Sequence, residues 1–178
     1  MAKMQTVINQ LDGETPRWFA IYSAFKKEKI AKKFLEKKGI ETYLPLQKVV
    51  RKYERKIKKL EIPLINCYLF VRITKKDYVT VLETDYISRF VKIGKDLLAI
   101  PNAEIEIMQR ILGEISDLEI EQNRFYEGDE VLISKGNLIG LVGKLVSFQG
   151  KEKVVVQLNN IGYSIQMEMD KSLLTKVI

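Results

Sequence analysis

Residues 63–73 form a largely apolar run that predicts a buried strand. The segment reads PLINCYLFVRI, and successive side chains of a strand point to opposite faces of its sheet. One face then carries only aliphatic side chains, those of Leu69, Val71 and Ile73. The other face carries two large aromatic rings and a cation, those of Tyr68, Phe70 and Arg72. The first face has the composition of a core, and the second requires an explanation.

The pattern on either side of this segment predicts an α+β domain. Residues 17–24 and 87–94 are rich in aromatic and β-branched residues and predict strands, and residues 40–50 predict a further strand interrupted at Pro45. Apolar residues at helical spacing, with start and stop signals such as Gly39 and Pro101, predict helices over 26–39, 75–85 and 101–112. The order β-α-β-β-α-β-α is that of a split βαβ arrangement, with helices against one antiparallel sheet.

The last third of the chain has a different pattern. Short strand-like runs are separated by turn residues, and the predicted strands are 129–133, 141–148, 153–158, 163–169 and 173–178. Five short strands in so short a stretch predict a small closed or nearly closed barrel, because closure removes exposed edges. The predicted domains are a flexible leader over 1–16, an α+β domain over 17–112, a linker over 113–123 and a barrel over 124–178.

Composition excludes several classes of function. The 178 residues include no histidine and one cysteine, Cys67, which excludes His-based catalytic triads, His-ligated metals, internal disulfides and Cys-rich zinc sites. No phosphate-binding glycine motif is present, so the sequence predicts neither a cofactor nor a metal. No apolar run approaches the length of a membrane span and no export signal is visible, so the expected compartment is the cytoplasm.

Charge is unevenly distributed along the chain. The net charge is +7; residues 1–112 carry +10 and the remainder carries −3. Seven of the cations lie between Lys48 and Lys59, with Glu54 as the single acid and Tyr53 among them. A protruding hairpin of this composition could bind phosphates, although a solvated loop would have the same composition. The lysines of residues 26–39 are interpreted as the solvent face of a helix.

Two sequence blocks resemble a known family. RWFAIYSAFKKEKIAKKFLEKKGIETYLPL, the PLINCYLFV block and ISRFVKIGKDLLAIPNAEI resemble the N-terminal domain of NusG-like transcription elongation factors. EGDEVLISKGNLIGLVGKL resembles the KOW motif that follows this domain in the same proteins. Asn137-Leu138 replaces the Pro-Phe pair that is usual in the housekeeping factor, and the sequence resembles the specialised RfaH/UpxY-type antiterminators more closely. The fold that this implies is a NusG-type N-terminal sheet domain followed by an SH3-like KOW barrel.

The resemblance implies a role for the aromatic face of the 63–73 strand. In the family this face grips the clamp helices of the largest catalytic subunit of RNA polymerase. The matching residues expected to bind polymerase here are Tyr68, Phe70, Ile93, Ile105 and Met108. The alternative from the residues alone is that all five simply lie in the core between sheet and helix.

The resemblance also implies contacts with nucleic acid and with further proteins. In the family the basic hairpin approaches upstream DNA and the polymerase lobe, and the segment after the central strand lies by the non-template strand. The corresponding residues are Arg51, Lys52, Arg55, Lys56, Lys75 and Lys76. The KOW barrel would recruit a ribosomal protein or a termination factor, and the protein is expected to be a monomer.

The sequence therefore predicts a non-enzymatic bacterial transcription factor that binds RNA polymerase. It is expected to suppress pausing or termination at specific operons. Two other classes of function stay open at this point. One is a KOW-containing module that binds ribosomal RNA, and the other is an enzyme that uses an unrecognised pair of acids.

Overall fold

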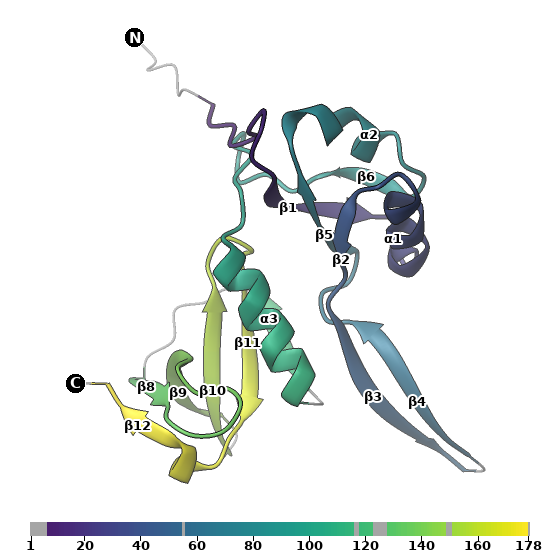
Figure 1. Ribbon diagram of the computed structural model, residues 1–178. Helices are drawn as coiled ribbons and strands as arrows, with labels where there is room; N and C mark the ends of the chain where they lie inside the picture. The colour runs from purple at the N-terminus through teal and green to yellow at the C-terminus, as the bar shows by residue number, and fades with distance from the viewer. Residues whose placement is uncertain (1–6, 55, 116–117, 123–127, 149–150, 178) are drawn as a thin grey trace. The chain divides into compact units, whose positions relative to one another are not determined.

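The chain forms two compact units in the computed structural model (Figure 1). The structure describes residues 7–54, 56–115, 118–122, 128–148 and 151–177. One unit combines Met1–Leu44 with Ile65–Asn102, and the other combines Pro45–Leu64 with Ala103–Ile178. This division groups the third helix with the C-terminal strands, whereas the sequence placed it in the N-terminal domain.

The first unit is built on a four-stranded antiparallel sheet with strand order β2-β5-β1-β6. Its strands are β1 (Arg17–Ser23), β2 (Glu41–Tyr43), β5 (Tyr68–Ile73) and β6 (Ile87–Phe90). Its helical elements are α1 (Glu28–Lys37), the short 3₁₀ helix η1 (Lys75–Asp77) and α2 (Tyr78–Leu82). Because β1 and β2 both pair antiparallel to β5, they run parallel to each other, and β5 and β6 are likewise parallel through β1. Both connections are thus βαβ crossovers, whose shared handedness puts α1 and α2 on the same face of the sheet.

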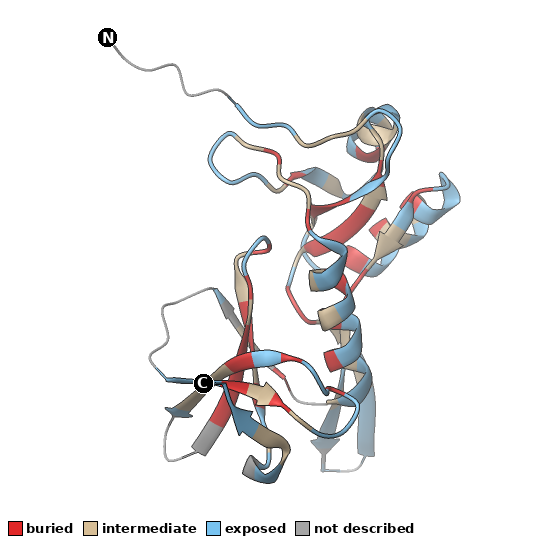
Figure 2. Ribbon diagram, turned by 60° about the vertical axis from the view of Figure 1, so that its left-hand side comes forward, coloured by how far each residue is buried: buried red, intermediate tan, exposed pale blue. Residues whose placement is uncertain are grey.

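Register in this sheet separates two sets of side chains, because directly opposed residues share a face. Phe19 lies opposite Val71, and Ile21 lies opposite both Leu69 and Phe90. This is the helix-covered face, because Tyr78 of α2 stacks on Phe90 with ring centroids 4.6 Å apart. All five of the aliphatic and aromatic side chains of β1 and β5 on this face, those of Phe19, Ile21, Leu69, Val71 and Ile73, are buried (Figure 2). The predicted division of the strand into core and aromatic faces is therefore correct.

The second unit contains a separate two-stranded ribbon, formed by β3 (Leu46–Tyr53) and β4 (Lys56–Pro63). Eight residues of each strand pair, from Leu46 opposite Pro63 to Tyr53 opposite Lys56. Pro45 separates β2 from β3, as predicted, since proline interrupts a strand ladder. Its carbonyl accepts a hydrogen bond from the Leu64 amide, which closes the base of the ribbon.

The rest of the second unit consists of α3 (Asn102–Glu114) and a six-stranded antiparallel sheet with strand order β12-β8-β9-β10-β11-β7. The strands are β7 (Glu119–Gln122), β8 (Asp129–Ile133), β9 (Val142–Phe148), β10 (Lys151–Leu158), β11 (Tyr163–Glu168) and β12 (Leu174–Lys176), with η2 (Lys171–Leu173) before the last. The five predicted strands are all present. β7 was not predicted, and it lies in the segment assigned to the linker.

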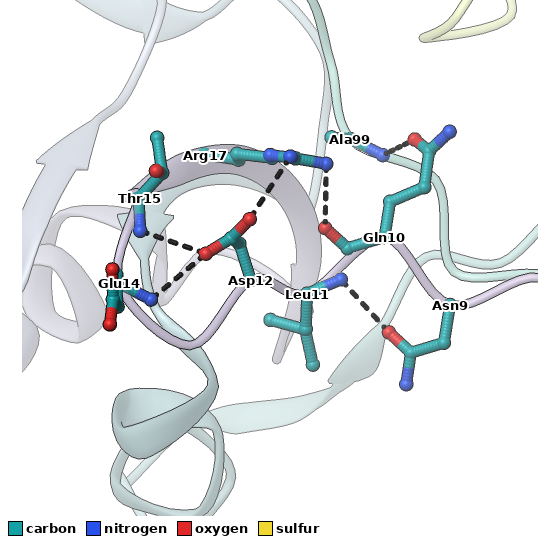
Figure 3. A network of polar contacts seen from close by, with 8 residues as sticks. All are labelled: Asn9, Gln10, Leu11, Asp12, Glu14, Thr15, Arg17 and Ala99. Carbon is teal, nitrogen blue, oxygen red and sulfur yellow. Dashed lines mark hydrogen bonds and ion pairs between the residues drawn. The ribbon is translucent and has the colours of Figure 1, made fainter.

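The N-terminal segment differs from the flexible leader that the sequence predicted. Asn9 pairs in parallel with Leu97, and the Gln10 side chain accepts a hydrogen bond from the Ala99 amide (Figure 3). Asp12 forms an ion pair with Arg17, and its Oδ1 accepts hydrogen bonds from the Glu14 and Thr15 amides. Residues 7–16 thus form an ordered strap, and residues 1–6 lie outside the described residues.

The 63–73 strand is shorter than predicted. Pro63 ends β4, residues 64–67 form a turn, and β5 begins at Tyr68. Cys67 closes this turn with φ of 64°, a left-handed conformation that breaks strand pairing. An apolar run therefore continued through a turn, which periodicity alone does not reveal. No helix in the described residues is long and apolar enough to cross a membrane.

Candidate functional site

The second face of the four-stranded sheet carries the rings that the sequence singled out. Residues opposed in register place Tyr22 beside Tyr68, Ala20 beside Phe70, and Tyr43 on the other side of Phe70. We call this the aromatic face; α1 and α2 lie on the opposite face of the same sheet. Its members are Trp18, Ala20, Tyr22, Tyr43, Tyr68, Phe70, Arg72, Glu41 and Arg89.

Two tyrosines on the central strands, Tyr22 of β1 and Tyr68 of β5, form a pair on the aromatic face. The Tyr22 and Tyr68 hydroxyl oxygens are 2.7 Å apart, and their rings meet edge to face with centroids 4.7 Å apart. The Arg89 guanidinium lies 5.0 Å from the centroid of the Tyr22 ring. This arrangement combines apolar area with polar handles, which suits a surface that binds another protein.

The two rings predicted to bind polymerase are not exposed. Tyr68 is 5% exposed and Phe70 is fully buried, with the Tyr43 ring centroid 6.1 Å from that of Phe70. Burial also raises the pKa of the Tyr43 hydroxyl, so this group stays neutral. The expectation of an uncovered apolar patch is therefore wrong for this conformation, and the role of these rings in binding stays a prediction.

The other predicted polymerase contacts fall into different settings. Ile93 follows β6 and is 53% exposed. Ile105 and Met108 lie on α3, where they are 3% and 0% exposed. The predicted set thus combines one accessible side chain with four buried ones.

Helix α3 is joined by hydrogen bonds to two loops of its own unit, one between β8 and β9 and one between β10 and β11. Arg110 Nη2 donates to the carbonyl oxygens of Asn137 and Ile139, at 3.0 and 2.8 Å. Glu104 Oε1 accepts hydrogen bonds from both the backbone and the side-chain nitrogen of Asn160. These contacts fix α3 within the second unit, where its residues Ile105, Met108 and Ile111 are buried.

The predicted nucleic-acid contacts lie on two exposed elements. Arg51, Lys52 and Lys56 are exposed on the β3–β4 ribbon, whereas Arg55 lies outside the described residues. Lys75 and Lys76 are exposed in η1. That turn is fixed by a capping box in which Asp77 Oδ2 accepts hydrogen bonds from the Thr74 amide and hydroxyl.

A further aromatic cluster lies at the end of the four-stranded sheet where β1 enters α1. Phe34 and Tyr86 stack with centroids 6.0 Å apart, and Lys37 and Lys27 lie 5.7 and 5.5 Å from the respective ring centroids. Phe25, shortly before α1, is 65% exposed, and Lys26 Nζ lies 5.1 Å from the centroid of its ring. Two of the lysines that were interpreted as a solvent face, Lys27 and Lys37, therefore also lie over aromatic rings.

Sequence reasoning missed Tyr22 and Tyr43 as members of the aromatic face. Both lie one strand away from Tyr68 and Phe70, and only the register brings them together. The alternation of RWFAIYS placed Tyr22 on the face of Trp18 and Ala20, which was the available signal. Tyr43 stands in a strand of three residues, too short for alternation to assign a face.

A protein-family model matches a little over half of the chain. The model described as "Transcription termination factor nusG" matches residues 16–109. This span contains the whole four-stranded sheet, the ribbon and most of α3. No curated protein matches the chain.

Comparison with solved structures shows the fold. A structure described as "Domain interaction in Thermotoga maritima NusG" has a TM-score of 0.53 and 20% identity, and the match covers 92% of this chain and 98% of that chain. Two conformations of the MjSpt4:Spt5 complex match with a TM-score of 0.32 each, at 18% and 20% identity, over 90% of this chain and 97% and 96% of theirs. The first likeness supports an N-terminal α+β domain followed by a β-rich domain, as predicted.

Proposed function

Because its residues 16–109 match the family model, this chain belongs to the NusG family of transcription factors, and we propose that it binds RNA polymerase through the aromatic face. The observation that carries this proposal is the position of Tyr22, Tyr68 and Phe70 on the sheet face opposite α1 and α2. The partner would be the clamp helices of the largest catalytic subunit, which would pack on this face as helices do in an apolar groove.

The burial of the rings adds a condition to the proposal. Tyr68 and Phe70 are buried in the complete chain, so this face must become accessible before the clamp helices can pack on it. The same holds for Ile105 and Met108, which are buried on α3 and would also have to be uncovered. In a protein that binds in this way, the conformation with the exposed face is a minor population until the partner binds and stabilises it.

The proposed effect on transcription follows if the protein connects the polymerase clamp to the opposite lobe. A factor that holds the clamp on one side and reaches the opposite lobe with its basic ribbon would keep the polymerase cleft closed. A closed cleft disfavours pausing and termination, so we propose an antitermination role, exercised at particular operons. The C-terminal sheet, as a KOW-type barrel, would recruit a ribosomal protein or a termination factor.

Site-specific crosslinking tests the surface without truncating a core side chain. Alanine at Phe70 would cost about 3–5 kcal/mol of stability because the ring is fully buried. We therefore place p-benzoyl-phenylalanine at Tyr22, which is half-buried on the aromatic face. The matched control is the same group at Val79, which is 57% exposed on α2.

The expected result is a photocrosslink to the largest polymerase subunit from position 22 and none from position 79. A crosslink of equal yield from both positions, or from neither, would remove the support for this surface. Occupancy mapped along transcribed DNA then separates a factor of particular operons from a general one. Recovery of ribosomal RNA in place of polymerase subunits would support the ribosomal alternative.

A further inference from the structure

We propose that one face of the β3–β4 ribbon, the face that carries Arg51, Lys56 and Lys58, binds the phosphates of double-stranded DNA, and that the opposite face does not. This inference rests on the proposed function, because it resolves which part of the basic ribbon would meet DNA. It also changes the contact set expected from the sequence, which treated Lys52 as equivalent to Arg51 and Lys56.

Register divides the ribbon into two chemically different faces, because directly opposed residues point to the same side. The face that we call the cationic face holds the opposed pairs Gln47–Ile62, Val49–Leu60, Arg51–Lys58 and Tyr53–Lys56. The face that we call the mixed face holds the pairs Leu46–Pro63, Lys48–Glu61, Val50–Lys59 and Lys52–Ile57. Each face contains three described cations, but the mixed face also contains Glu61, so the net charges of the two faces are +3 and +2.

The arrangement of the charges separates the two faces further. On the mixed face every lysine lies opposite an acid or an aliphatic residue, as Lys59 lies opposite Val50 and Lys52 opposite Ile57. On the cationic face Arg51 lies directly opposite Lys58, and like charges in this position destabilise a ribbon. Lys56, two residues before Lys58 along β4, extends the same row by ~7 Å.

No acid in the described part of the chain lies within ion-pair distance of this row. Arg51, Lys56 and Lys58 are all exposed, and none of them forms an ion pair with a described residue. An isolated two-stranded ribbon is marginally stable at best, so a repulsive pair near its end is costly unless it serves a ligand. A polyanion would relieve the repulsion and neutralise all three cations at once.

The shape of the ribbon favours duplex DNA among polyanions. Its sheet has only two strands, each eight residues long, so the ribbon reaches about 26 Å. The major groove of B-DNA admits a two-stranded ribbon, and phosphate rows border the groove on both sides. The mixed face differs in kind, because exposed Val50 and Ile57 interrupt its lysines. Contacts from the cationic row to phosphates would position the protein without reading sequence.

Binding of the complete protein to duplex DNA, without polymerase, tests this inference apart from the proposed function. Fluorescence anisotropy is measured with one labelled duplex at several salt concentrations between about 50 and 200 mM. The test variant is the double substitution Arg51→Thr and Lys58→Thr, and the matched control is Lys52→Thr and Lys59→Thr. Both remove two cations from the same ribbon, so both lower the net charge of +7 equally, and threonine preserves strand propensity.

The slope of log K against log salt should fall by about 1.8 in the test variant, because each phosphate contact contributes about 0.9. The control should change the slope by less than half of that amount. Equal losses in both variants would overturn the assignment to one face. Absence of duplex binding by the wild-type protein, or tighter binding of a single strand of the same length, would overturn the assignment to duplex DNA.

Thermal unfolding followed by circular dichroism checks that both double variants are folded, so that their DNA binding can be compared. Loss of the repulsive Arg51–Lys58 pair should leave the melting temperature of the test variant at or above that of the control. A lower melting temperature together with lost binding would mean that these cations support the ribbon itself, and would contradict the proposal. Failure of the crosslinking test at Tyr22 would leave this result unaffected, so the two proposals can fail separately.

Discussion

The hydroxyl groups of Tyr22 and Tyr68 form a hydrogen bond, 2.7 Å between oxygens, across neighbouring strands of the four-stranded sheet. Their rings also meet edge to face, so the two residues are coupled through a polar and an aromatic contact. A pair of this kind fixes the orientation of both rings on the aromatic face.

Replacing one tyrosine at a time with phenylalanine should measure this coupling. Tyr68→Phe should lower the free energy of unfolding by about 1 kcal/mol, because it leaves the Tyr22 hydroxyl without its partner. Tyr22→Phe should have a similar effect, and the double variant should cost less than the sum of the two. Urea unfolding of the four proteins in a double-mutant cycle gives the coupling energy. Strict additivity would show that the hydrogen bond contributes nothing to stability.

Glu28 is a buried acid whose role is structural. The side chain is 4% exposed, and its Oε1 accepts a hydrogen bond of 2.8 Å from the Cys67 amide. Glu28→Ala should destabilise the protein by about 1–3 kcal/mol, because the buried amide loses its acceptor. Glu28→Gln keeps an oxygen in place and should cost clearly less. Thermal or urea unfolding separates the two, and equal losses would mean that charge, not the acceptor, matters here.

The aromatic face shows how far sequence reasoning reaches in this protein. Alternation in YLFVRI assigned Tyr68 and Phe70 to one face, and the register confirms it. Alternation describes one strand at a time, so it could not show that Tyr22 and Tyr43 join the same face. Nor could it show burial, because an aromatic side chain has the same periodicity whether or not a neighbouring element covers it.

The ends of elements were predicted less well than their existence. The apolar run through Leu64 and Ile65 concealed a turn, because both residues are buried even though neither belongs to a strand. The decisive residue is Cys67, and cysteine carries no turn signal. The ordered strap was missed for a related reason: Gln10 and Asp12 bind backbone groups of residues far away in the sequence, which leave no local pattern.

Backbone strain at Cys67 can be relieved by glycine. Its φ of 64° is left-handed, a conformation that costs a residue with a Cβ about 1–2 kcal/mol and costs glycine little. Because glycine also loses more conformational entropy on folding, the net gain of Cys67→Gly should be about 0.5–1 kcal/mol. Cys67→Ala is the matched control, since it removes the thiol and keeps the Cβ. Urea unfolding should rank glycine above both alanine and wild type, and an equal gain from alanine would assign the effect to the thiol.

Asp12 makes the N-terminal strap sensitive to acid. Hydrogen bonds from the Thr15 and Glu14 amides, aided by Arg17, hold the pKa of the Asp12 carboxyl below its ordinary value of 3.8. Because the folded-state pKa lies below the unfolded one, the carboxylate stabilises the strap at neutral pH. That stabilisation is lost as the pH falls from about 4 through the folded-state pKa.

Amide hydrogen exchange, corrected for the intrinsic effect of pH, should therefore show that protection of Glu14 and Thr15 decreases in this acid range. The variant Asp12→Asn keeps an oxygen that can accept both hydrogen bonds but carries no titratable charge. In this variant the Glu14 and Thr15 amides should be less protected at neutral pH, because the ion pair with Arg17 is gone. Their protection should then stay constant over the acid range in which the Asp12 carboxyl of the wild-type protein becomes protonated. Acid-dependent protection that persists in Asp12→Asn would show that another group controls the strap.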